Sequence, residues 1–303
     1  MQITKFDDLM HHLADHNRQV SVAVVKAEDE STQEALRQAM EQGFVRTVFV
    51  GGRQAIEANM QLMEQKEKFR IVDMDDPEEA CAQAVALVRE GKADVLMKGL
   101  VNTDKLLRAI LNKETGILPK GRLLTHITAA ELADYDKLLF FTDPAVLPSP
   151  TLEQRREQIA YLKTLCHAFG IDCPRIALIH CTEKVNGKHF PVTLDYQQLT
   201  EEWKAGQVGD CIVDGPLDLK TSICRESMLT KGISSPIDGH ADAVIFPDIQ
   251  AANVFFKIIT FLPTTKVACC LQGTDAPVVL TSRSDSTETK FLSLALAAQS
   301  VHN

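Results

Sequence analysis

Residues 93–103 read ADVLMKGLVNT, an apolar run that ends in a lysine and a glycine before a polar helix start. The run predicts a buried strand over 93–97, and Thr103 opens a predicted helix. The same alternation of apolar run and helical pattern precedes it, with strands at 20–25, 47–50 and 70–72 and helices at 32–42, 53–65 and 77–90. Strands that are apolar throughout and joined by helices indicate a parallel sheet covered on both faces, so the predicted fold class is α/β.

The alternation resumes after an irregular stretch at 118–150, in which 122–127 and 137–141 are the predicted strands and Pro144, Pro148 and Pro150 prevent a continuous helix. The predicted helices that follow are 151–169, 194–205, 221–230 and 251–262, and the predicted strands are 175–180, 211–213, 241–246 and 266–271. We therefore expect two α/β/α domains with mainly parallel sheets. A strand at 277–281 and a helix at 286–299 would return to the first domain, giving domains 1–125 plus 280–303 and 126–279.

Composition excludes several classes of function. The 303 residues carry 32 Lys+Arg against 41 Asp+Glu, and no basic block suggests nucleic-acid binding. No apolar run reaches the ~18 residues of a membrane span, and residues 1–18 lack a secretory signal pattern, so we expect a cytoplasmic protein without a membrane partner. Eight cysteines without a C-x-x-C pair indicate reduced structural thiols. Asp242 and Asp248 are too small a ligand set to indicate a cation, so we expect no metal.

Polar residues at strand ends are the candidates for a site, because open α/β sheets bind ligands beyond the carboxyl ends of their strands. Lys98, Gly99, Asn102 and Thr103 follow the predicted strand at 93–97, and Arg108 lies on the helix after it. A cation, a close-approaching glycine and free helix N–H groups would cradle a phosphate. The same residues also fit a plain turn, an ordinary helix cap and a solvated arginine, and both interpretations stay open on the residues alone.

The second rich junction is Thr281-Ser282-Arg283-Ser284-Asp285, directly before the last predicted helix. Asp285 and Glu288 have capping-box spacing and so fit a helix start, whereas Ser282 and Arg283 are better explained by an anion or a thiol. Further strand-end groups are Asp143-Pro144, Glu183-Lys184-Val185-Asn186, Asp214-Gly215-Pro216-Leu217, Pro247-Asp248 with Asn253 and Lys257, and Gln272-Gly273. Each group alone consists of residue types that are common in turns, but the recurrence of such groups at successive strand ends favours a binding site. No Rossmann, P-loop, zincin or nucleophile-elbow motif occurs.

The ordered series of motifs resembles the phosphate acetyl/butyryltransferase family, and the butyryltransferase branch is the nearer one. The motifs are Thr182-Glu183-Lys184-Val185-Asn186, Asp214-Gly215-Pro216-Leu217, Lys231-Gly232-Ile233, Gly239-His240-Ala241-Asp242, Phe246-Pro247-Asp248, Asn253, Phe256-Lys257, Gln272-Gly273 and Thr281-Ser282-Arg283. The resemblance runs from about residue 93 onward. The Gly-Asn pair and the Tyr-Lys pair of the family are replaced in this sequence by Ala252-Asn253 and Phe256-Lys257.

The resemblance implies reversible conversion of acyl-CoA and phosphate to acyl phosphate and CoA, on a two-domain fold like that of the isocitrate and isopropylmalate dehydrogenases, with the active site in an interdomain cleft. It also implies a homo-oligomer that takes CoA as substrate and needs no other cofactor. Ser282 would contact the thiol or the reacting carbonyl, and Arg283 and Arg108 would hold oxygens. The phosphate- and CoA-binding residues would be Lys98, Gly99, Asn102, Thr103, Asp214, Gly215, Pro216, Asn253, Lys257, Gln272 and Gly273.

The general base is where the chain departs from the family. The acetyl-transferring branch has an acidic residue seven places after the motif serine, and here that position is Thr289. Glu288 and Asp285 are the nearest carboxylates, and Glu288 is the candidate. Two other functions are weighed: an NAD(P)-linked hydroxyacid dehydrogenase of similar architecture, and a non-catalytic sensor of CoA or acyl phosphate. The dehydrogenase would need an aspartate set for magnesium, and the sensor would not need Ser282, Arg283 and Arg108 together.

Overall fold

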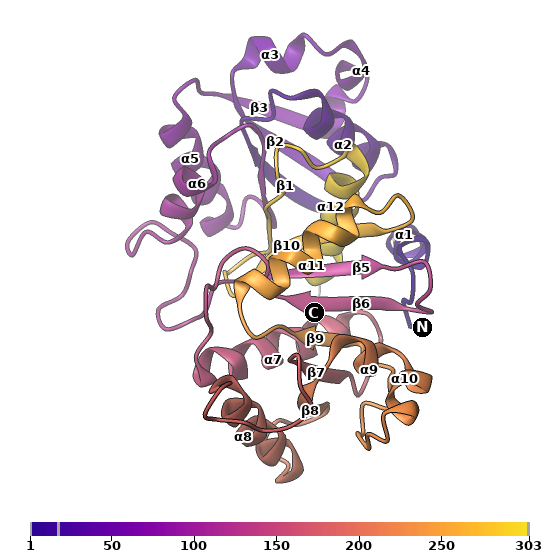
Figure 1. The fold of residues 1–303 in the computed structure, drawn as a ribbon. Coiled ribbons are helices and arrows are strands. Elements are labelled where there is room, and N and C mark those ends of the chain that lie inside the picture. The colour runs from indigo at the N-terminus through magenta and orange to yellow at the C-terminus, as the bar shows by residue number, and fades with distance from the viewer. Residues whose placement is uncertain (1, 17–18, 302–303) are drawn as a thin grey trace. The chain divides into compact units, whose positions relative to one another are not determined.

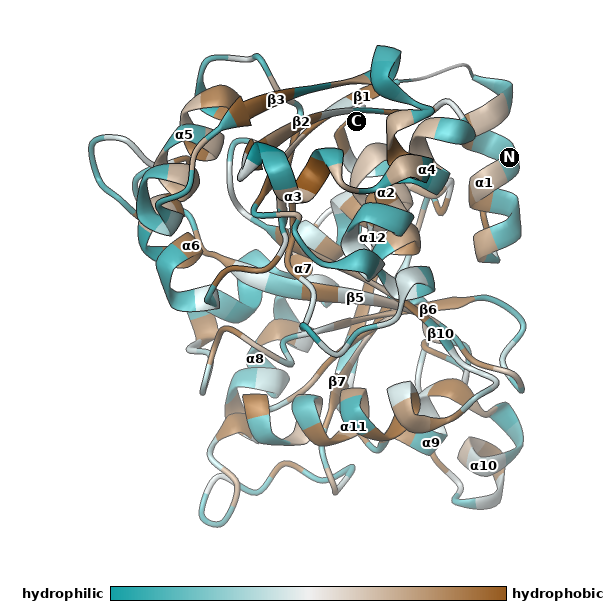
Figure 2. Ribbon diagram, turned by 90° about the horizontal axis from the view of Figure 1, so that it is seen from above, coloured by the Kyte–Doolittle hydropathy of each residue, from teal (hydrophilic) through white to brown (hydrophobic). Residues whose placement is uncertain are grey.

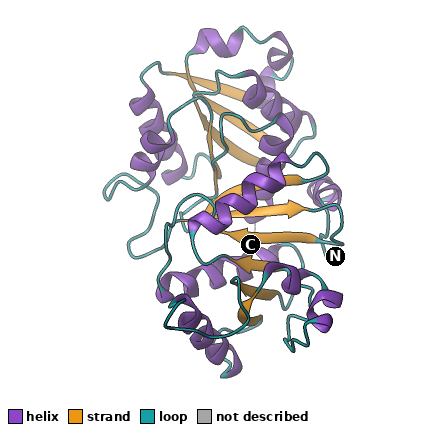
Figure 3. Cartoon of the chain, in the orientation of Figure 1, coloured by secondary structure: helices purple, strands orange, loops and turns teal. Residues whose placement is uncertain are grey.

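The computed structural model describes residues 2–16 and 19–301, and the chain divides into two compact units. The first unit contains Phe6–Leu124 and the residues from Val267 onward, and the second contains Thr125–Lys266 and the residues up to Lys5. In each unit helices flank the strands of a sheet (Figures 1 and 3). Among the described residues, no helix is both long and apolar enough to cross a membrane.

The first unit has strand order β3-β2-β1-β4-β11-β10, and all neighbours are parallel except β10 and β11. The strands are β1 (Val20–Val25), β2 (Val45–Gly51), β3 (Phe69–Asp73), β4 (Val95–Lys98), β10 (Lys266–Gln272) and β11 (Val278–Val279). The helices are α1 (Phe6–Asp15), α2 (Glu30–Glu41), α3 (Arg53–Glu57), α4 (Met60–Met63), η1 (Lys66–Lys68), α5 (Pro77–Arg89), α6 (Thr103–Ile110) and α12 (Thr287–Val301). Strands β1 and β2 are buried along most of their length and largely brown in Figure 2, as expected for strands covered on both faces.

The first unit also takes up residues 267–279, which the sequence analysis places in the second domain. Strand β10 pairs antiparallel with β11 at Leu271 and Val278. Strand β11 in turn pairs parallel with β4, through Val278 with Leu96 and Val279 with Met97. The chain therefore joins the first sheet before residue 280, because this short antiparallel pair supplies the connection.

The second unit has strand order β5-β6-β9-β7-β8, in which β5 and β6 are antiparallel and the other neighbours are parallel. The strands are β5 (Thr125–Glu131), β6 (Leu138–Thr142), β7 (Arg175–Ile179), β8 (Ile212–Leu217) and β9 (Ala243–Ile245). The helices are α7 (Leu152–Ala168), α8 (Val192–Lys204), α9 (Leu219–Ile223), α10 (Arg225–Thr230) and α11 (Ile249–Phe261). The predicted α/β class with mainly parallel pairing is confirmed in both units.

Side-chain caps fix where the helices of the first unit begin, and so fix the edge of its sheet. The Asp29 carboxylate accepts the Thr32 N–H at 3.0 Å at the start of α2, and the Asp76 carboxylate accepts two N–H groups at the start of α5. Helix α2 follows β1, α5 follows β3 and α6 follows β4. The carboxyl ends of these parallel strands and the helix starts therefore share one edge.

Candidate functional site

The turn after β4 is held tightly against the end of β1. The Gly99 N–H donates to the Val25 carbonyl at 2.8 Å, and the Leu100 N–H donates to the Lys26 carbonyl at 2.6 Å. A Cβ on Gly99 would lie 2.5 Å from the Lys26 carbonyl oxygen and 2.6 Å from that of Val25. Only glycine fits, and this close approach places Lys98 beside the segment that leads into α2.

A small pocket lies at this edge of the first unit, and we call it the edge pocket. Its lining residues come from the end of β4, the cap of α2 and the segment before α12: Asp29, Lys98, Gly99, Leu100, Thr281, Ser282, Arg283 and Lys290. Three of them are cations and one is a carboxylate. Of the predicted site residues, the structure brings Lys98, Gly99, Ser282 and Arg283 together here.

Two polar groups of the edge pocket are buried without a strong partner. Lys98 is 3% exposed, and its Nζ donates only to the Gly99 and Thr281 carbonyls, at 3.3 and 3.4 Å. Burial lowers the pKa of Lys98, and the Arg283 and Lys290 charges lower it further. The Thr281 hydroxyl is buried with no hydrogen-bond partner within the described chain. Leaving such groups unpaired is costly, so an anion that accepts from both would be bound favourably.

Arg283 and Ser282 stand in a closed turn outside α12. The Arg283 Nη2 donates to the Asn102 Oδ1 at 2.5 Å, which ties this turn to the residue that precedes α6. The Ser282 N–H donates to the Asp285 Oδ2 at 2.7 Å, and the Ser282 hydroxyl lies 3.1 Å from that of Ser284. Ser282 and Arg283 are both exposed, so their side chains are accessible to a ligand.

The predicted cap of the last helix is wrong. Ser286, not Asp285, accepts the N–H three residues on, from Thr289 at 3.1 Å, and α12 begins at Thr287. Asp285 closes the turn around Ser282 instead, because the helix starts one residue later than capping by Asp285 requires. Glu288 is exposed in the first turn of α12 and does not line the edge pocket.

Lys290 and Asp29 form a partly buried ion pair within the edge pocket. Lys290 is 2% exposed, and its Nζ donates to the Asp29 Oδ1 at 2.9 Å, the Ser31 hydroxyl at 2.6 Å and the Thr32 hydroxyl at 3.0 Å. Burial raises the pKa of Asp29, but hydrogen bonds from Lys290, Thr32 and Ser31 lower it to below its ordinary value. The carboxylate is therefore ionised at neutral pH.

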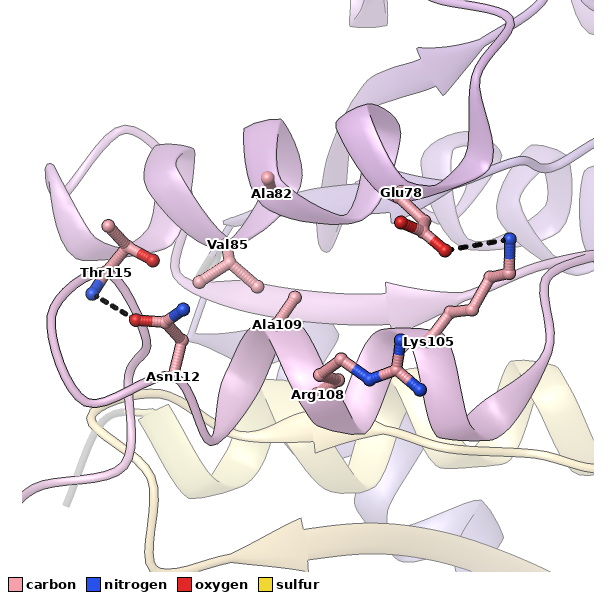
Figure 4. A pocket seen from close by; sticks show the side chains of 8 residues that line it. All are labelled: Glu78, Ala82, Val85, Lys105, Arg108, Ala109, Asn112 and Thr115. Carbon is pink, nitrogen blue, oxygen red and sulfur yellow. Dashed lines mark hydrogen bonds and ion pairs between the residues drawn. The ribbon is translucent and has the colours of Figure 1, made fainter.

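The structure does not bring Arg108 to the edge pocket. Arg108 lines a different pocket between α5 and α6, where Lys105 pairs with Glu78 at 3.2 Å (Figure 4). Arg108 lies six positions after Asn102, the N-cap of α6, which is about one and two-thirds helical turns, so the two side chains leave the helix axis in different directions. Arg108 and Arg283 thus line different pockets, and the phosphate-holding role of Arg108 stays a prediction.

The remaining predicted residues of the first unit lie outside the edge pocket. Thr103 is exposed at the first position of α6. Gln272 ends β10, where its amide contacts the Cys270 sulfur at 3.8 Å, and Gly273 follows with φ of +104°. That positive φ explains the glycine as a turn requirement.

The predicted residues of the second unit make internal contacts. Asp214 accepts from the Ser235 hydroxyl at 2.5 Å, and Asn253 donates to the Pro144 carbonyl at 2.9 Å. Gly215 precedes Pro216 in β8, and a Cβ on Gly215 would lie 2.6 Å from Leu178. Lys257 is exposed, with its ammonium 5.2 Å from the Phe256 ring centroid.

Asp242 and Asp248, the two carboxylates considered as cation ligands, both accept hydrogen bonds from other groups of the chain. Asp242 accepts from Lys137 at 2.5 Å and from the Arg175 N–H at 2.7 Å. Asp248 caps α11 by accepting the Ala251 N–H. Within the described ranges, no cluster of three or more His, Cys, Asp or Glu residues could hold a metal ion.

The cysteines offer no activated nucleophile among the buried thiols. Burial raises the pKa of Cys81 and of Cys211 to about 11, and that of Cys270 to about 12. Burial also raises the pKa of Cys166. A thiol attacks as thiolate, so these four are poor nucleophiles at neutral pH.

Sequence reasoning missed four residues of the edge pocket as site residues: Asp29, Leu100, Thr281 and Lys290. Asp29 follows the strand at 20–25, so the same strand-end rule that selected Lys98 could have found it. Lys290 is a cation on the apolar face of a helix, flanked by Phe291 and Leu292. A lysine in such a position needs a buried partner, and that is a usable signal.

Comparison with known proteins gives one consistent result. The family model for phosphate acetyl/butaryl transferase matches residues 77–298. A phosphate butyryltransferase of Clostridium beijerinckii is 39% identical over 299 residues, which cover 97% of this chain and 96% of that protein. A phosphate acetyltransferase of Thermotoga maritima is 37% identical over 278 residues, which cover 91% and 94% of the two chains. Among solved structures, a branched-chain phosphotransacylase from Enterococcus faecalis V583 matches with a TM-score of 0.82 and 29% identity, covering 94% of this chain and all of that one.

Proposed function

We infer the chemistry of the chain from its family, because it belongs to the phosphate acetyl/butyryl transferases. It is an acyltransferase that converts an acyl-CoA and phosphate reversibly to an acyl phosphate and CoA. The relatives named above carry out butyryl and acetyl transfer. We propose a short-chain acyl group, butyryl or a close relative, as the substrate of this chain.

We propose that the edge pocket binds the phosphate and the reacting acyl oxygen. The observation that carries this assignment is the buried Lys98 ammonium beside the unpartnered Thr281 hydroxyl, with the Arg283 guanidinium at the same pocket. Phosphate offers acceptor oxygens to all three groups. The cations would also stabilise the oxyanion of the tetrahedral intermediate, which is commonly the largest contribution to such catalysis.

Ser282 would contact the thiol or the carbonyl, and the acyl group would pass directly from sulfur to phosphate oxygen in a ternary complex. Holding both substrates together supplies orientation, and no acyl-enzyme is needed. The supporting observation is the raised pKa of the buried Cys81, Cys211 and Cys270 thiols, which argues against an acyl intermediate on these three residues. The phosphate- or CoA-binding roles of Gly99, Asn102, Thr103, Asp214, Gly215, Pro216, Asn253, Lys257, Gln272 and Gly273 stay predictions.

We propose that CoA enters as a substrate, that no other cofactor takes part, and that the chain forms a homo-oligomer. Four apolar side chains on or directly after α11 support the last point: Val254, Ile258, Phe261 and Leu262 are 69, 52, 81 and 44% exposed. Large apolar side chains gathered on one surface are typical of protein interfaces. Cytoplasmic location, the interdomain cleft and the likeness to isocitrate dehydrogenases stay predictions.

Thiol release from acetyl-, propionyl-, butyryl- and branched acyl-CoA with phosphate tests the reaction, and Lys98→Met tests the pocket. Losing a charged hydrogen bond of about 1.5–3 kcal/mol should raise the KM for phosphate by roughly 10- to 150-fold. Lys105→Met is the matched control, because Lys105 pairs with Glu78 in the other pocket, and it should stay within about twofold of wild type. Binding of CoA without any thiol release would favour the sensor, and reduction of NAD(P) with a hydroxyacid would favour the dehydrogenase.

A further inference from the structure

We propose that Asp29 is the proton acceptor for the reacting thiol, with Oδ2 as the accepting atom. The inference rests on the proposed phosphate acyltransfer at the edge pocket. Thr289 stands at the position where the acetyl-transferring branch has its acidic residue, and Asp29 would take over the role of that residue.

Asp29 is the one carboxylate among the described residues that line the edge pocket. Glu288, the candidate from sequence, is exposed and outside the lining. Asp285 also lies outside the lining, and its Oδ2 accepts the Ser282 N–H at 2.7 Å. Ser282 and Asp29 line the same pocket, whereas Asp285 closes the turn around Ser282 and lies outside the lining.

The hydrogen bonds of Asp29 are concentrated on one oxygen. Oδ1 accepts from the Thr32 N–H at 3.0 Å, the Thr32 hydroxyl at 2.9 Å, the Ser31 hydroxyl at 2.8 Å and the Lys290 ammonium at 2.9 Å. Within the described chain, Oδ2 has no such donor. Four donors on Oδ1 hold the carboxylate in one orientation and leave the other oxygen open to take a proton. Lys290, itself buried, thereby acts as a positioning residue.

The proton balance closes without another reactant. When CoA attacks an acyl phosphate, the S–H bond breaks and the proton moves to Asp29 Oδ2 while the C–S bond forms, and the C–O bond to phosphate then breaks. The departing phosphate oxygen takes the proton from Asp29, so phosphate is released as hydrogen phosphate, the dianion. In the other direction the proton of hydrogen phosphate passes through Asp29 to the departing sulfur.

The charges that face Asp29 keep it in the accepting form. Lys290 from α12, Lys98 from the end of β4 and Arg283 from the turn before α12 all line the same pocket, and no second carboxylate of the described residues does. Removal of a proton from the thiol by a positioned carboxylate in the transition state is typically worth 10²- to 10⁴-fold in rate.

The test is Asp29→Asn, because asparagine and aspartate are equally good helix N-caps and the variant should keep the start of α2. We expect kcat to fall by about 10²- to 10⁴-fold while the KM for phosphate changes little. The rate of the variant should rise about tenfold per pH unit toward the thiol pKa, since the thiol must then ionise in solution, and the wild type should show no such slope. Asp76→Asn is the matched control, an N-cap aspartate of α5 outside the edge pocket, and should behave as wild type.

The Asp29→Asn variant leaves the buried Lys290 without its carboxylate partner. The double variant Asp29→Asn/Lys290→Gln has no unpaired buried charge and therefore repeats the test. It should be as slow as Asp29→Asn and show the same pH slope. A rate within fivefold of wild type, or a loss of rate without a changed pH profile, would refute the inference while leaving the acyltransfer intact. Absence of thiol release by the wild type would instead refute the proposed function, and the inference with it.

Discussion

Replacement of Gly99 by alanine tests whether the turn after β4 sets the edge pocket. The new Cβ would lie 2.5 Å from the Lys26 carbonyl oxygen, whereas ordinary contact begins at 3.4 Å, so 3.4 − 2.5 = 0.9 Å of backbone movement is required. The obstacle is backbone, which cannot swing aside like a side chain. Overpacking of this kind costs about 1–3 kcal/mol, and weakening the two turn hydrogen bonds adds about 1 kcal/mol each.

A loss of about 3 kcal/mol corresponds to roughly 100-fold faster exchange of amides that open with the unit. Hydrogen exchange read by mass spectrometry should show this in β1 and β4, together with reduced thiol release. Gly52→Ala is the control, because its Cβ would lie 3.1 Å from the Asp75 carboxylate, a side chain that can move. Equal exchange rates in the two variants would refute the argument that carbonyl contact at Gly99 holds the turn.

Two further predictions concern charge and assembly. Asp29 has a folded-state pKa below its unfolded value, so its stabilisation is present above the unfolded value and is lost as pH falls through the folded value. Lys290→Met removes the cation that lowers this pKa, so the variant should unfold at a lower urea concentration than wild type at pH 7, and the gap should shrink below about pH 4; an unchanged gap at low pH would contradict the role of the pair. Phe261→Ser combined with Ile258→Glu should lower the mass measured by light scattering if α11 joins copies of the chain, and an unchanged mass would exclude that surface.

The local sequence pattern predicted strands and helices well where the bounds of an element depend on its own residues alone. The strand at 20–25 has the predicted bounds, and the strand at 93–97 is observed as Val95–Lys98. The predicted helix at 53–65 is divided into α3 and α4, because the Asn59 side-chain Oδ1 accepts the Leu62 N–H and caps a second helix. Helix α1 was not predicted at all. The face of α1 toward α12 is buried, and this packing depends on the tertiary structure, so the local sequence does not reveal it.

The candidate site was predictable only in part for the same reason. Strand-end position selected Lys98 and Ser282–Arg283, since the carboxyl ends of parallel strands share an edge. It could not decide on which side of α6 Arg108 points, and the observed side faces α5. Nor could it pair Asp29 with Lys290, because 261 residues separate them in the chain and only the packed structure brings them within 2.9 Å.

That separation bears on how the enzyme is made. Asp29 leaves the ribosome early, yet its partner Lys290 is translated only after the whole second unit has been synthesised. Contacts so distant in sequence form late, since loop closure must precede them. A nascent chain arrested before Lys290 can therefore complete the second unit while the edge pocket stays unassembled, so acyltransfer should begin only when α12 has docked.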